Sequence, residues 1–364
     1  MKDLLFVAIV IMFFVVIFQI AKASEYVSIL KGEEKARKQN NKINAFFLVG
    51  FLVLGLIGVY WCHEMYYGKT LFAFGSASAE GVDIDFMFKM TTLVTGIVFV
   101  ITQVLLFYFG YKYQESDNRK AFYFPHNNKL ELLWTTVPAI FLTVLVVFGL
   151  KYWFKMTGEP IVKDKSLITV EITGHQFGWE FRYPGVDGVL GRKNFKLTSA
   201  KNPLGVDFDG DSTASRDDIH VNSTMHLPVG HPVKLVINSQ DVIHDVGLSH
   251  FRMKMDAVPG IPTTMWFTPI VTSAEMKKRT NNPNFVYEIS CDQMCGVGHY
   301  SMKANIVVES EADYNKWLGE QKAEYLSFRP SAAPAVKDST VTTPAPSAAV
   351  VKSATQVASL EKNK

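Results

Sequence analysis

The sequence has few of the features that mark several common classes of protein. Only three of its 364 residues are cysteine, and none of them stands in the C-x-x-C-H motif that attaches haem covalently. Basic and acidic residues nearly balance, giving a formal net charge of +3, and no block of basic residues stands out. We therefore expect no haem on this chain and no nucleic-acid partner.

Charge is also absent from four long apolar runs, all of which lie before residue 152. The runs are Leu4–Ala21, Ala45–Cys62, Thr91–Tyr111 and Leu132–Leu150. Each approaches the roughly 20 residues that cross a hydrocarbon core of about 30 Å. Because buried core helices rarely show such long uncharged runs, the sequence predicts four transmembrane helices.

The charges of the loops predict the orientation of these helices. The loops after the first and third runs are basic, whereas the loop after the second has more acidic than basic residues. Because short basic loops stay on the cytoplasmic side, the N-terminus and the C-terminal half are predicted to lie outside. The alternative is a signal peptide cleaved near residues 21–23, but it would place the first basic loop outside.

The second half of the chain changes character at Ile168, where short alternating segments begin between Gly, Pro, Asn and Asp residues. This pattern predicts an all-β sandwich or barrel. The predicted parts are an N-terminal helix pair (1–62), a helix hairpin (63–155), a β domain (160–310), a terminal helix (311–328) and a disordered tail (329–364). Residues 185–232 show little periodicity and are expected to form a polar insertion.

Two of the three cysteines lie in one short loop, CDQMCGVGHYSM, with potential metal ligands at Cys291, Cys295, His299 and Met302. The flanking segments look like strands, so a loop that turns these side chains towards one point is expected. Thiolate, imidazole and thioether together favour copper over magnesium or calcium. Structural zinc would more often use C-x-x-C pairs, and a disulfide would leave His299 and Met302 unexplained.

The loop supplies only one histidine. One cysteine with histidines and a methionine would form a mononuclear copper site, whereas two cysteines permit two bridged coppers that each need a histidine. The second histidine must then come from elsewhere in the chain. His244, at the end of a predicted strand, is the candidate, and His250 competes with it.

These motifs closely resemble subunit II of the haem–copper cytochrome c oxidases, from about Lys89 to Val308. The segments VIHDVGLSHFRMKMDAVPG and CDQMCGVGHYSM carry the resemblance. It implies a cupredoxin-like β domain with a dinuclear copper centre, CuA. Carried over, Cys291 and Cys295 bridge the coppers, His244 and His299 bind one copper each, Met302 is a weak ligand of one, and the backbone carbonyl of Gln293 serves the other.

The sequence departs from the family pattern at two places. Gln293 stands where the family has a glutamate that also reaches a magnesium ion at the boundary with subunit I, so magnesium is doubtful here. Phe177 stands where the family has the tryptophan that takes the electron from cytochrome c, although Trp179 remains. These two aromatic residues either pack the sandwich or form a changed site at which electrons enter.

Glu131 lies at the inner end of the fourth apolar run, three residues before Trp134. An acidic residue at the edge of a span is either a solvated interfacial charge or part of an ion path. In the family, a glutamate at this position marks the mouth of a proton channel of subunit I. The loop charges place Glu131 on the inner side, where protons would enter.

The resemblance implies the subunit of a respiratory terminal oxidase at which electrons enter. Cytochrome c, or a complex-bound cytochrome c domain, would reduce CuA, and the electron would pass to the haem of subunit I for oxygen reduction and proton translocation. The implied location is the inner (plasma) membrane of a bacterium, with the copper domain and the N-terminus on the periplasmic side. A membrane-tethered copper-delivery protein is the alternative, but it does not explain Glu131.

Overall fold

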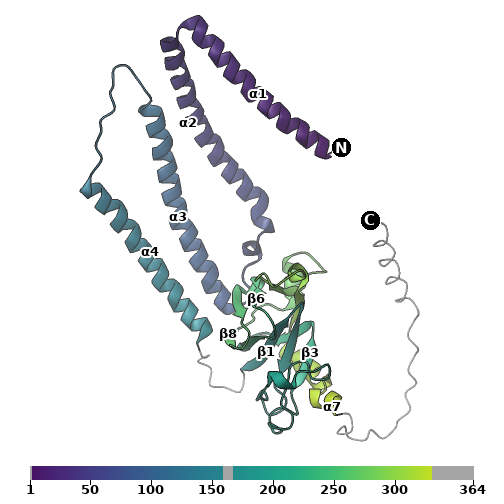
Figure 1. The fold of residues 1–364 in the computed structure, drawn as a ribbon. Coiled ribbons are helices and arrows are strands. Elements are labelled where there is room, and N and C mark those ends of the chain that lie inside the picture. The colour runs from purple at the N-terminus through teal and green to yellow at the C-terminus, as the bar shows by residue number, and fades with distance from the viewer. Residues whose placement is uncertain (1, 159–166, 330–364) are drawn as a thin grey trace.

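The structure is a computed structural model that describes residues 2–158 and 167–329. All but the first residue of the predicted tail, 329–364, lies outside the described residues. The described part comprises a helical half and a β domain that follow one another along the chain (Figure 1). The tail prediction therefore stays a prediction.

The helical half contains four helices that are long and apolar enough to cross a membrane, which confirms the predicted spans. They are α1 (Lys2–Lys31), α2 (Glu33–Tyr66), α3 (Ala79–Lys112) and α4 (Asn128–Thr157). Their apolar side chains point outwards and remain exposed, as expected for helices whose solvent is lipid. Helices α1 and α2 are joined at Gly32 alone, which has a φ of 81° that favours glycine.

Ion pairs fix which loops lie together at the ends of the helices far from the β domain (Figure 1). Arg37, just after the α1–α2 turn, lies 3.0 Å from Glu115 and 3.8 Å from Asp117 in the α3–α4 loop. Lys38 also pairs with Asp117. The two loops that the charge pattern placed on the same side are therefore neighbours, and α1 to α4 run in alternating directions.

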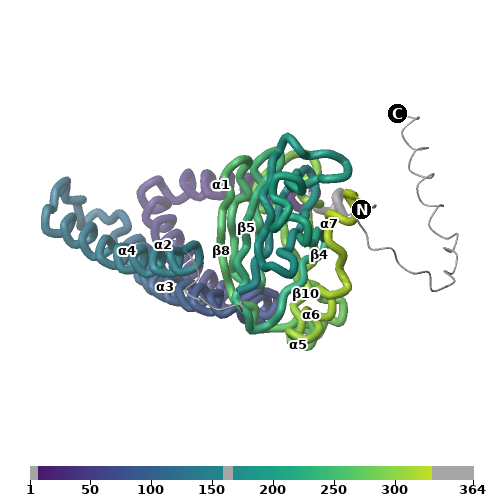
Figure 2. The backbone as a smooth tube through the Cα atoms, turned by 90° about the horizontal axis from the view of Figure 1, so that it is seen from below, coloured from purple at the N-terminus to yellow at the C-terminus, as the bar shows by residue number. Residues whose placement is uncertain are grey.

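The β domain is built from two five-stranded sheets, with strand orders β3-β2-β1-β5-β8 and β4-β10-β9-β6-β7. Figure 2 separates β8 and β5 of the first sheet from β4 and β10 of the second. The strands of the first sheet are β1 (Ile168–His175), β2 (Gly178–Tyr183), β3 (Ile219–Asn222), β5 (Val233–Ser239) and β8 (Thr263–Phe267); those of the second are β4 (Thr224–Pro228), β6 (His244–Leu248), β7 (Met253–Ala257), β9 (Tyr287–Cys291) and β10 (Lys303–Glu309).

Both sheets bury one face in a common core, which explains the alternating sequence pattern. Val170 and Ile172 of β1 and Ile289 of β9 are fully buried there. The all-β prediction is confirmed by these two sheets, but the sequence pattern missed several elements. Two strands, β3 and β4, lie inside the segment 185–232, and helix α5 (Ser273–Arg279) lies between β8 and β9.

Residues 311–328, predicted as one helix, form two helices. They are α6 (Glu311–Glu320) and α7 (Glu324–Phe328), separated by Gln321–Ala323. Residue Gln321 is extended, with a φ of −77° and a ψ of 153°, which ends α6. The Trp317 ring of α6 stacks on His226 of β4, with 4.1 Å between the ring centres, so α6 is held against the second sheet.

The start of α3 docks directly on the β domain. The Ser78 hydroxyl accepts a hydrogen bond from the Gly81 N–H and donates one to the Phe251 carbonyl at 2.7 Å. Asp85 makes two hydrogen bonds with the Arg252 guanidinium. A side chain at position 81 would meet the Phe251 carbonyl oxygen 2.7 Å away, so glycine permits this close approach. These contacts fix the β domain against the transmembrane hairpin.

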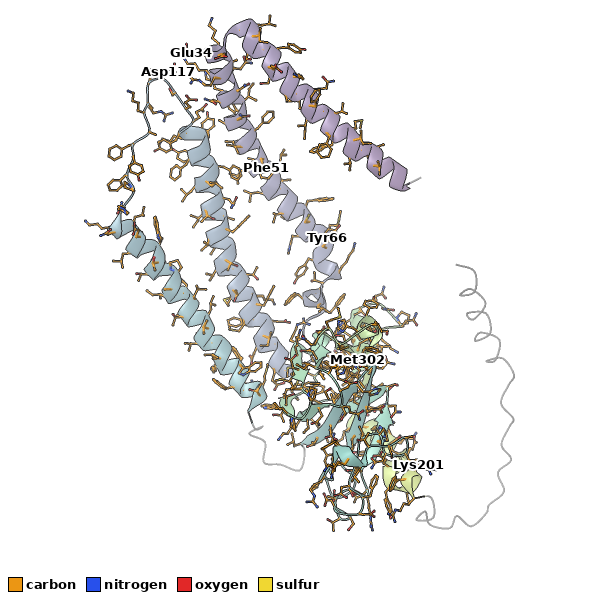
Figure 3. The ribbon with its side chains drawn as sticks, in the orientation of Figure 1. Glu34, Phe51, Tyr66, Asp117, Lys201 and Met302 are labelled. Atoms are coloured by element: carbon orange, nitrogen blue, oxygen red, sulfur yellow. The ribbon has the colours of Figure 1, made fainter. Side chains whose placement is uncertain are left out.

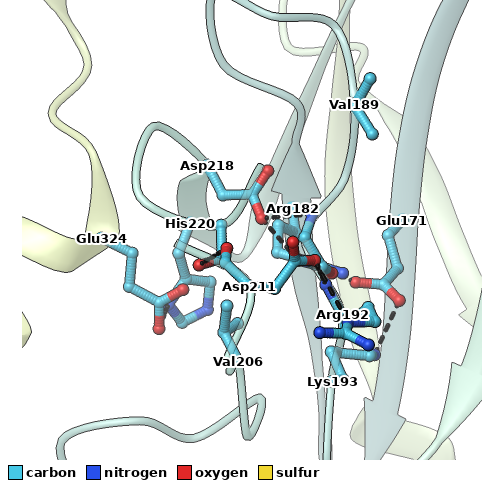
Figure 4. Close-up of polar contacts among 12 residues, drawn as sticks. Glu171, Arg182, Val189, Arg192, Lys193, Val206, Asp211, Asp218, His220 and Glu324 are labelled. Carbon is cyan, nitrogen blue, oxygen red and sulfur yellow. Dashed lines mark hydrogen bonds and ion pairs between the residues drawn. The ribbon is translucent and has the colours of Figure 1, made fainter. Parts of the chain in front are cut away.

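A buried ionic cluster ties the insertion to the first sheet (Figure 4). The Arg182 side chain is 3% exposed and bonds both Glu171 and Asp218 at 2.6 Å. Lys193 adds a second cation 2.7 Å from Glu171. Burial works to raise the pKa of Glu171, but Arg182 and Lys193 outweigh it and hold that pKa below its usual value. Burial prevails at Asp218 and raises its pKa to about 7.

Removing the shared cation of this cluster is predicted to destabilise the β domain. Arg182→Ala leaves two buried carboxyl groups without their main partner, so we expect a loss of about 3–5 kcal/mol in unfolding free energy. Arg192→Ala is the matched control, because Arg192 is 71% exposed and its pairing with Asp211 should contribute less than about 1 kcal/mol. Thermal unfolding of the purified chain measures both, and equal shifts for the two variants would contradict a central role for Arg182.

Candidate metal site

Strand pairing brings three predicted ligands to one face of the second sheet. Val246 of β6 pairs with Cys291 of β9, and His244 lies two residues before Val246, on the same face. On the other side of β9, the Cys291 N–H donates to the carbonyl of Met302, which directly precedes β10. Figure 3 shows Met302 in the part of the β domain nearer the helices, with Lys201 at the opposite end.

The loop between β9 and β10 returns the remaining ligands to these three. The Cys295 Sγ lies 3.8 Å from the Cys291 Sγ. The Cys291 Sγ is 3.8 Å from the His244 Nδ1, and the Cys295 Sγ is 3.6 Å from the His299 Nδ1. Each thiol therefore faces its own imidazole nitrogen. The metal-binding atoms of His244, Cys291 and Cys295 all lie within 4.8 Å of one another.

Two weaker donors complete the cluster. The backbone carbonyl of Gln293 is 3.2 Å from the Cys291 Sγ, and the Met302 Sδ is 3.9 Å from the Cys295 Sγ. Both cysteines are free, and a sulfur separation of 3.8 Å is far longer than the S–S bond of about 2.05 Å. The structure therefore holds a pair of thiols rather than a disulfide.

Most of the cluster is buried, although His299 is half-buried and Gln293 is exposed. His244 and Met302 are fully buried, and Cys291 and Cys295 are 8% and 5% exposed. Burial, together with the neighbouring Cys291, raises the pKa of the Cys295 thiol to about 11. At neutral pH this thiol keeps its proton, so a metal ion that binds as a thiolate complex must displace it. Two thiols, two imidazoles, a thioether and a carbonyl form a donor set that suits copper.

Asp241 orients the buried histidine, and the sequence analysis missed it. Its Oδ1 lies 2.7 Å from the His244 Nε2, and its Oδ2 accepts the Gln176 N–H at 2.7 Å. Burial works to raise the pKa of Asp241, but the hydrogen bonds with His244 and two backbone N–H groups lower it overall. A carboxylate on the far nitrogen fixes the ring so that Nδ1 faces the thiols. The only sequence signal was an aspartate three residues before His244.

The hairpin between β1 and β2 packs directly on the loop that carries the cysteines. The Gln176 side-chain amide donates to the Cys295 carbonyl at 2.5 Å. Gly298 lies against the Phe177 ring, because a Cβ there would come within 2.4 Å of it. Gly296 has a φ of 134°, and a side chain there would meet Gln176 and Phe177. Phe177 is therefore half-buried as a support beneath this loop.

Neither Trp179 nor His250 faces the thiols of the cluster. Trp179 is 3% exposed and lies edge-on to His244, with 6.0 Å between the ring centres. His250, the competing histidine, packs against Phe285 and Tyr287 instead of the thiols. Burial lowers the pKa of His250 below its ordinary value. Of the two candidate histidines, the structure brings His244 to the cysteines.

Glu131 lies in the first turn of α4, at the end of that helix far from the β domain (Figure 1). Its Oε1 accepts the Asn127 N–H at 3.2 Å, while the Asn127 side chain accepts the Leu130 N–H at 3.1 Å. This reciprocal arrangement caps the helix. The glutamate therefore has a structural contact of its own, and it remains exposed on the side opposite the metal-site cluster.

Asp241→Asn is predicted to weaken copper binding by about 10–100-fold, because the amide no longer holds the His244 ring as a carboxylate does. Glu309→Gln is the matched control. The Glu309 carboxylate also bonds a histidine ring, at 2.8 Å from the His226 Nδ1, but that histidine lies outside the cluster. Competition titration with a copper chelator measures both variants, and similar affinities in the two would contradict the role given to Asp241.

Comparison with known proteins assigns most of the region from α3 to β10. Residues 168–311 match the family described as cytochrome c oxidase subunit II, periplasmic domain, and residues 67–152 match the transmembrane domain of the same subunit. Residues 1–66 lie outside both matches. The helix pair α1–α2 is therefore additional to the part that the family shares.

Individual relatives agree with this match. The alternative cytochrome c oxidase subunit 2 of Bradyrhizobium diazoefficiens is 35% identical over 239 residues, covering 66% of this chain and 80% of that protein. Cytochrome c oxidase subunit 2 of Cereibacter sphaeroides is 26% identical over 256 residues, covering 68% and 78%.

A solved structure, the periplasmic domain of subunit II of cytochrome oxidase from Bradyrhizobium japonicum, is 22% identical and covers 42% of this chain and 91% of that one. Its TM-score of 0.27 is too low for the superposition to place individual residues. The assignment rests instead on the sequence matches over both halves and on the relative at 35% identity. The chain belongs to the cytochrome c oxidase subunit II family.

Proposed function

We propose that this chain receives electrons from cytochrome c at a dinuclear copper centre held by His244, Cys291, Cys295, His299, Met302 and the backbone carbonyl of Gln293. The observation that carries the proposal is the pair of unbonded thiols, each facing its own imidazole nitrogen. As a member of its family, the chain is part of an oxidoreductase complex and is the subunit at which electrons enter it. Oxygen reduction is assigned to subunit I.

The arrangement of donors supports two copper ions rather than one. A mononuclear site would leave one thiol and one imidazole unused inside a largely buried cluster, where unpaired polar groups are costly. Two copper ions would give every donor a role, with Cys291 and Cys295 shared between them. When bound there, the copper pair would supply one-electron redox chemistry. The chain's own contribution is to fix the donors before the electron arrives, through the strand pairing and Asp241.

The surface above the cluster supports docking of an electron donor. Met294, Val297 and Tyr300 of the loop are each at least 75% exposed, although all three are large apolar or aromatic residues. Gly296 and Gly298, which flank Val297, pack against the half-buried Phe177, so the patch is supported from below. Exposed apolar patches beside a polar rim are typical of protein interfaces. We therefore place the cytochrome c contact on the patch of Met294, Val297 and Tyr300.

The positions of Phe177 and Trp179 give them different parts in this proposal. Phe177 lies between the exposed patch and the sheet, so it is the aromatic residue nearer to a docked donor. Trp179 lies behind His244 and serves mainly to pack that ring. Its buried indole N–H has no hydrogen-bond partner among the described residues. The proposed path for electrons therefore starts at the loop and its Phe177 support rather than at Trp179.

The place of the chain in a membrane completes the proposal. The four helices make it a membrane protein with a periplasmic-type domain, and its relatives are bacterial. We propose the inner membrane, with the copper domain on the periplasmic side and subunit I beside the α3–α4 hairpin. Glu131, at the opposite side, is proposed to stand at the mouth of a proton path into subunit I. The sequence predicts that magnesium at the boundary with subunit I is doubtful, and this stays a prediction.

A copper-delivery protein fits the geometry less well. Delivery requires release of the metal, which favours an exposed and incomplete set of ligands. Here His244 and Met302 are inaccessible to solvent, and the hairpin with Gln176 and Phe177 supports the loop from beneath. The buried thiols and the complete set of ligands therefore support a resident metal centre that transfers electrons.

Substitution of a cysteine inside the cluster, compared with one outside it, provides a direct test. Cys291→Ser removes a bridging thiolate, so we expect loss of the copper pair and oxidation of reduced cytochrome c only at the rate of membranes without the oxidase. Cys62→Ser is the matched control, because Cys62 is exposed on α2 and has no partner among the described residues. Copper content and cytochrome c oxidation by the purified complex are measured together. Normal copper content and turnover in Cys291→Ser would refute the proposed centre.

The docking patch is tested by replacing apolar side chains with uncharged polar ones. Met294→Ser combined with Val297→Ser should raise the KM for cytochrome c about tenfold, since loss of apolar contact at an interface centre costs ~1.4 kcal/mol. Val186→Ser is the control, because Val186 is also fully exposed but belongs to the insertion after β2. Steady-state kinetics and the copper EPR spectrum are recorded for both. If the double variant kept both its KM and its copper spectrum, cytochrome c would dock at another surface and the proposed patch would be wrong.

A further inference from the structure

A cleft of about 590 Å³ lies where the additional helix pair meets the part of the chain shared by the family. One wall comes from His63 and Tyr67, at the end of α2, and the other from Phe88, Lys89 and Leu93, near the start of α3. Figure 1 shows both helix ends next to the β domain, and Figure 3 labels Tyr66 at this end of α2. Its volume is in the range of small-molecule sites.

The depth of the cleft places it at the outer membrane surface. The apolar run of α2 ends at Cys62, and that of α3 begins at Thr91. His63 and Lys89 therefore lie at the level of the lipid headgroups, whereas Leu93 lies one turn deeper, in the acyl region. The cleft thus changes from polar to apolar along the membrane normal. A ligand with a polar head and an apolar tail matches this change.

The charge of the cleft is positive. Lys89 is exposed and makes no ion pair within the described residues, and the acidic side chains in the first turns of α3 already have partners. Asp83 pairs with Lys155 at 3.0 Å, Asp85 pairs with Arg252, and Glu80 accepts the Thr268 N–H at 2.7 Å. No acidic residue is among those that line the cleft, so its lining carries a positive charge at Lys89. Lysine is a common ligand of phosphate groups.

The apolar wall of the cleft is held by the β domain. The rings of Phe72 and Phe88 stack with their centres 4.5 Å apart, and the Arg252 guanidinium lies 5.1 Å from the Phe72 ring centre. Arg252 also donates to the Leu71 carbonyl at 2.9 Å and bonds Asp85. These contacts with Arg252 hold the Phe72 and Phe88 wall of the cleft in place.

We propose that this cleft binds an anionic phospholipid of the outer leaflet, with its phosphate on Lys89 beside His63 and an acyl chain along Leu93. Basic pockets between transmembrane helices bind anionic headgroups at the cytoplasmic or matrix surface, and Lys89 offers the same contact at the outer surface. The bound lipid bridges α2 and α3 beside the copper domain. Because α2 lies outside the shared family region, the site is a property that the additional helices give to this chain. The inference does not depend on the copper centre.

Native mass spectrometry of the full-length chain, purified in mild detergent with the subunits that accompany it, tests the site. Phosphatidylglycerol, phosphatidylcholine and inorganic phosphate are added in separate experiments. We expect the protein to retain one more molecule of phosphatidylglycerol than of phosphatidylcholine. Inorganic phosphate should not displace the bound phosphatidylglycerol. Lys89→Gln should weaken the retention about fivefold, as expected for the loss of one lysine near an anionic headgroup, whereas Lys89→Arg should preserve it.

Two further variants test the apolar end of the cleft and the specificity of the Lys89 effect. Leu93→Trp fills the apolar end of the cleft and should also displace the lipid. Lys112→Gln, at the other end of α3, is the matched control and should retain it. Equal retention of phosphatidylglycerol by Lys89→Gln, Leu93→Trp and the control would overturn the proposal. Equal retention of phosphatidylcholine, displacement by inorganic phosphate, or recovery of a quinone in place of the lipid would overturn it as well.

Discussion

The Sγ atoms of Cys291 and Cys295 lie 3.8 Å apart without a bond between them, and the rest of the site depends on this separation. Cys291 is fixed by its pairing with Val246 on one side and with Met302 on the other. Cys295 is fixed from outside the sheet, by the Gln176 amide on its carbonyl. The two cysteines are thus held by different parts of the fold, and each thiol faces an imidazole nitrogen in a set of donors that suits a metal site.

The same strands also connect the site to the membrane. His244 opens β6, and the chain runs from β6 through Phe251 to Arg252, the two residues on which α3 docks. The ligand and the membrane anchor are therefore separated by only a few residues of continuous backbone. This short connection fixes the height of the candidate metal site above the helices. It also makes Arg252 a shared support of the copper domain and the interfacial cleft.

Much of the fold was predictable because its signals are local. Uncharged runs of membrane length identify the four helices, and the ligands within 291–302 are close in sequence. His244 was predictable only because the loop has one histidine too few. Asp241 was not, since a lone aspartate near a histidine has no distinctive pattern. Strands β3 and β4 were missed because each is short, at four and five residues, and lies within a segment that is otherwise polar. Their partners, β2 and β10, are distant in sequence from at least one of them, so the pairing leaves no local signal.

The most direct test of the central claim is the EPR spectrum of the purified oxidase complex, recorded together with the number of copper ions that this chain binds. The account predicts two coppers per chain and a hyperfine pattern in which one unpaired electron is shared equally between two copper nuclei. A single copper with the hyperfine pattern of one nucleus, or a chain whose two loop cysteines are joined as a disulfide in the active complex, would contradict it.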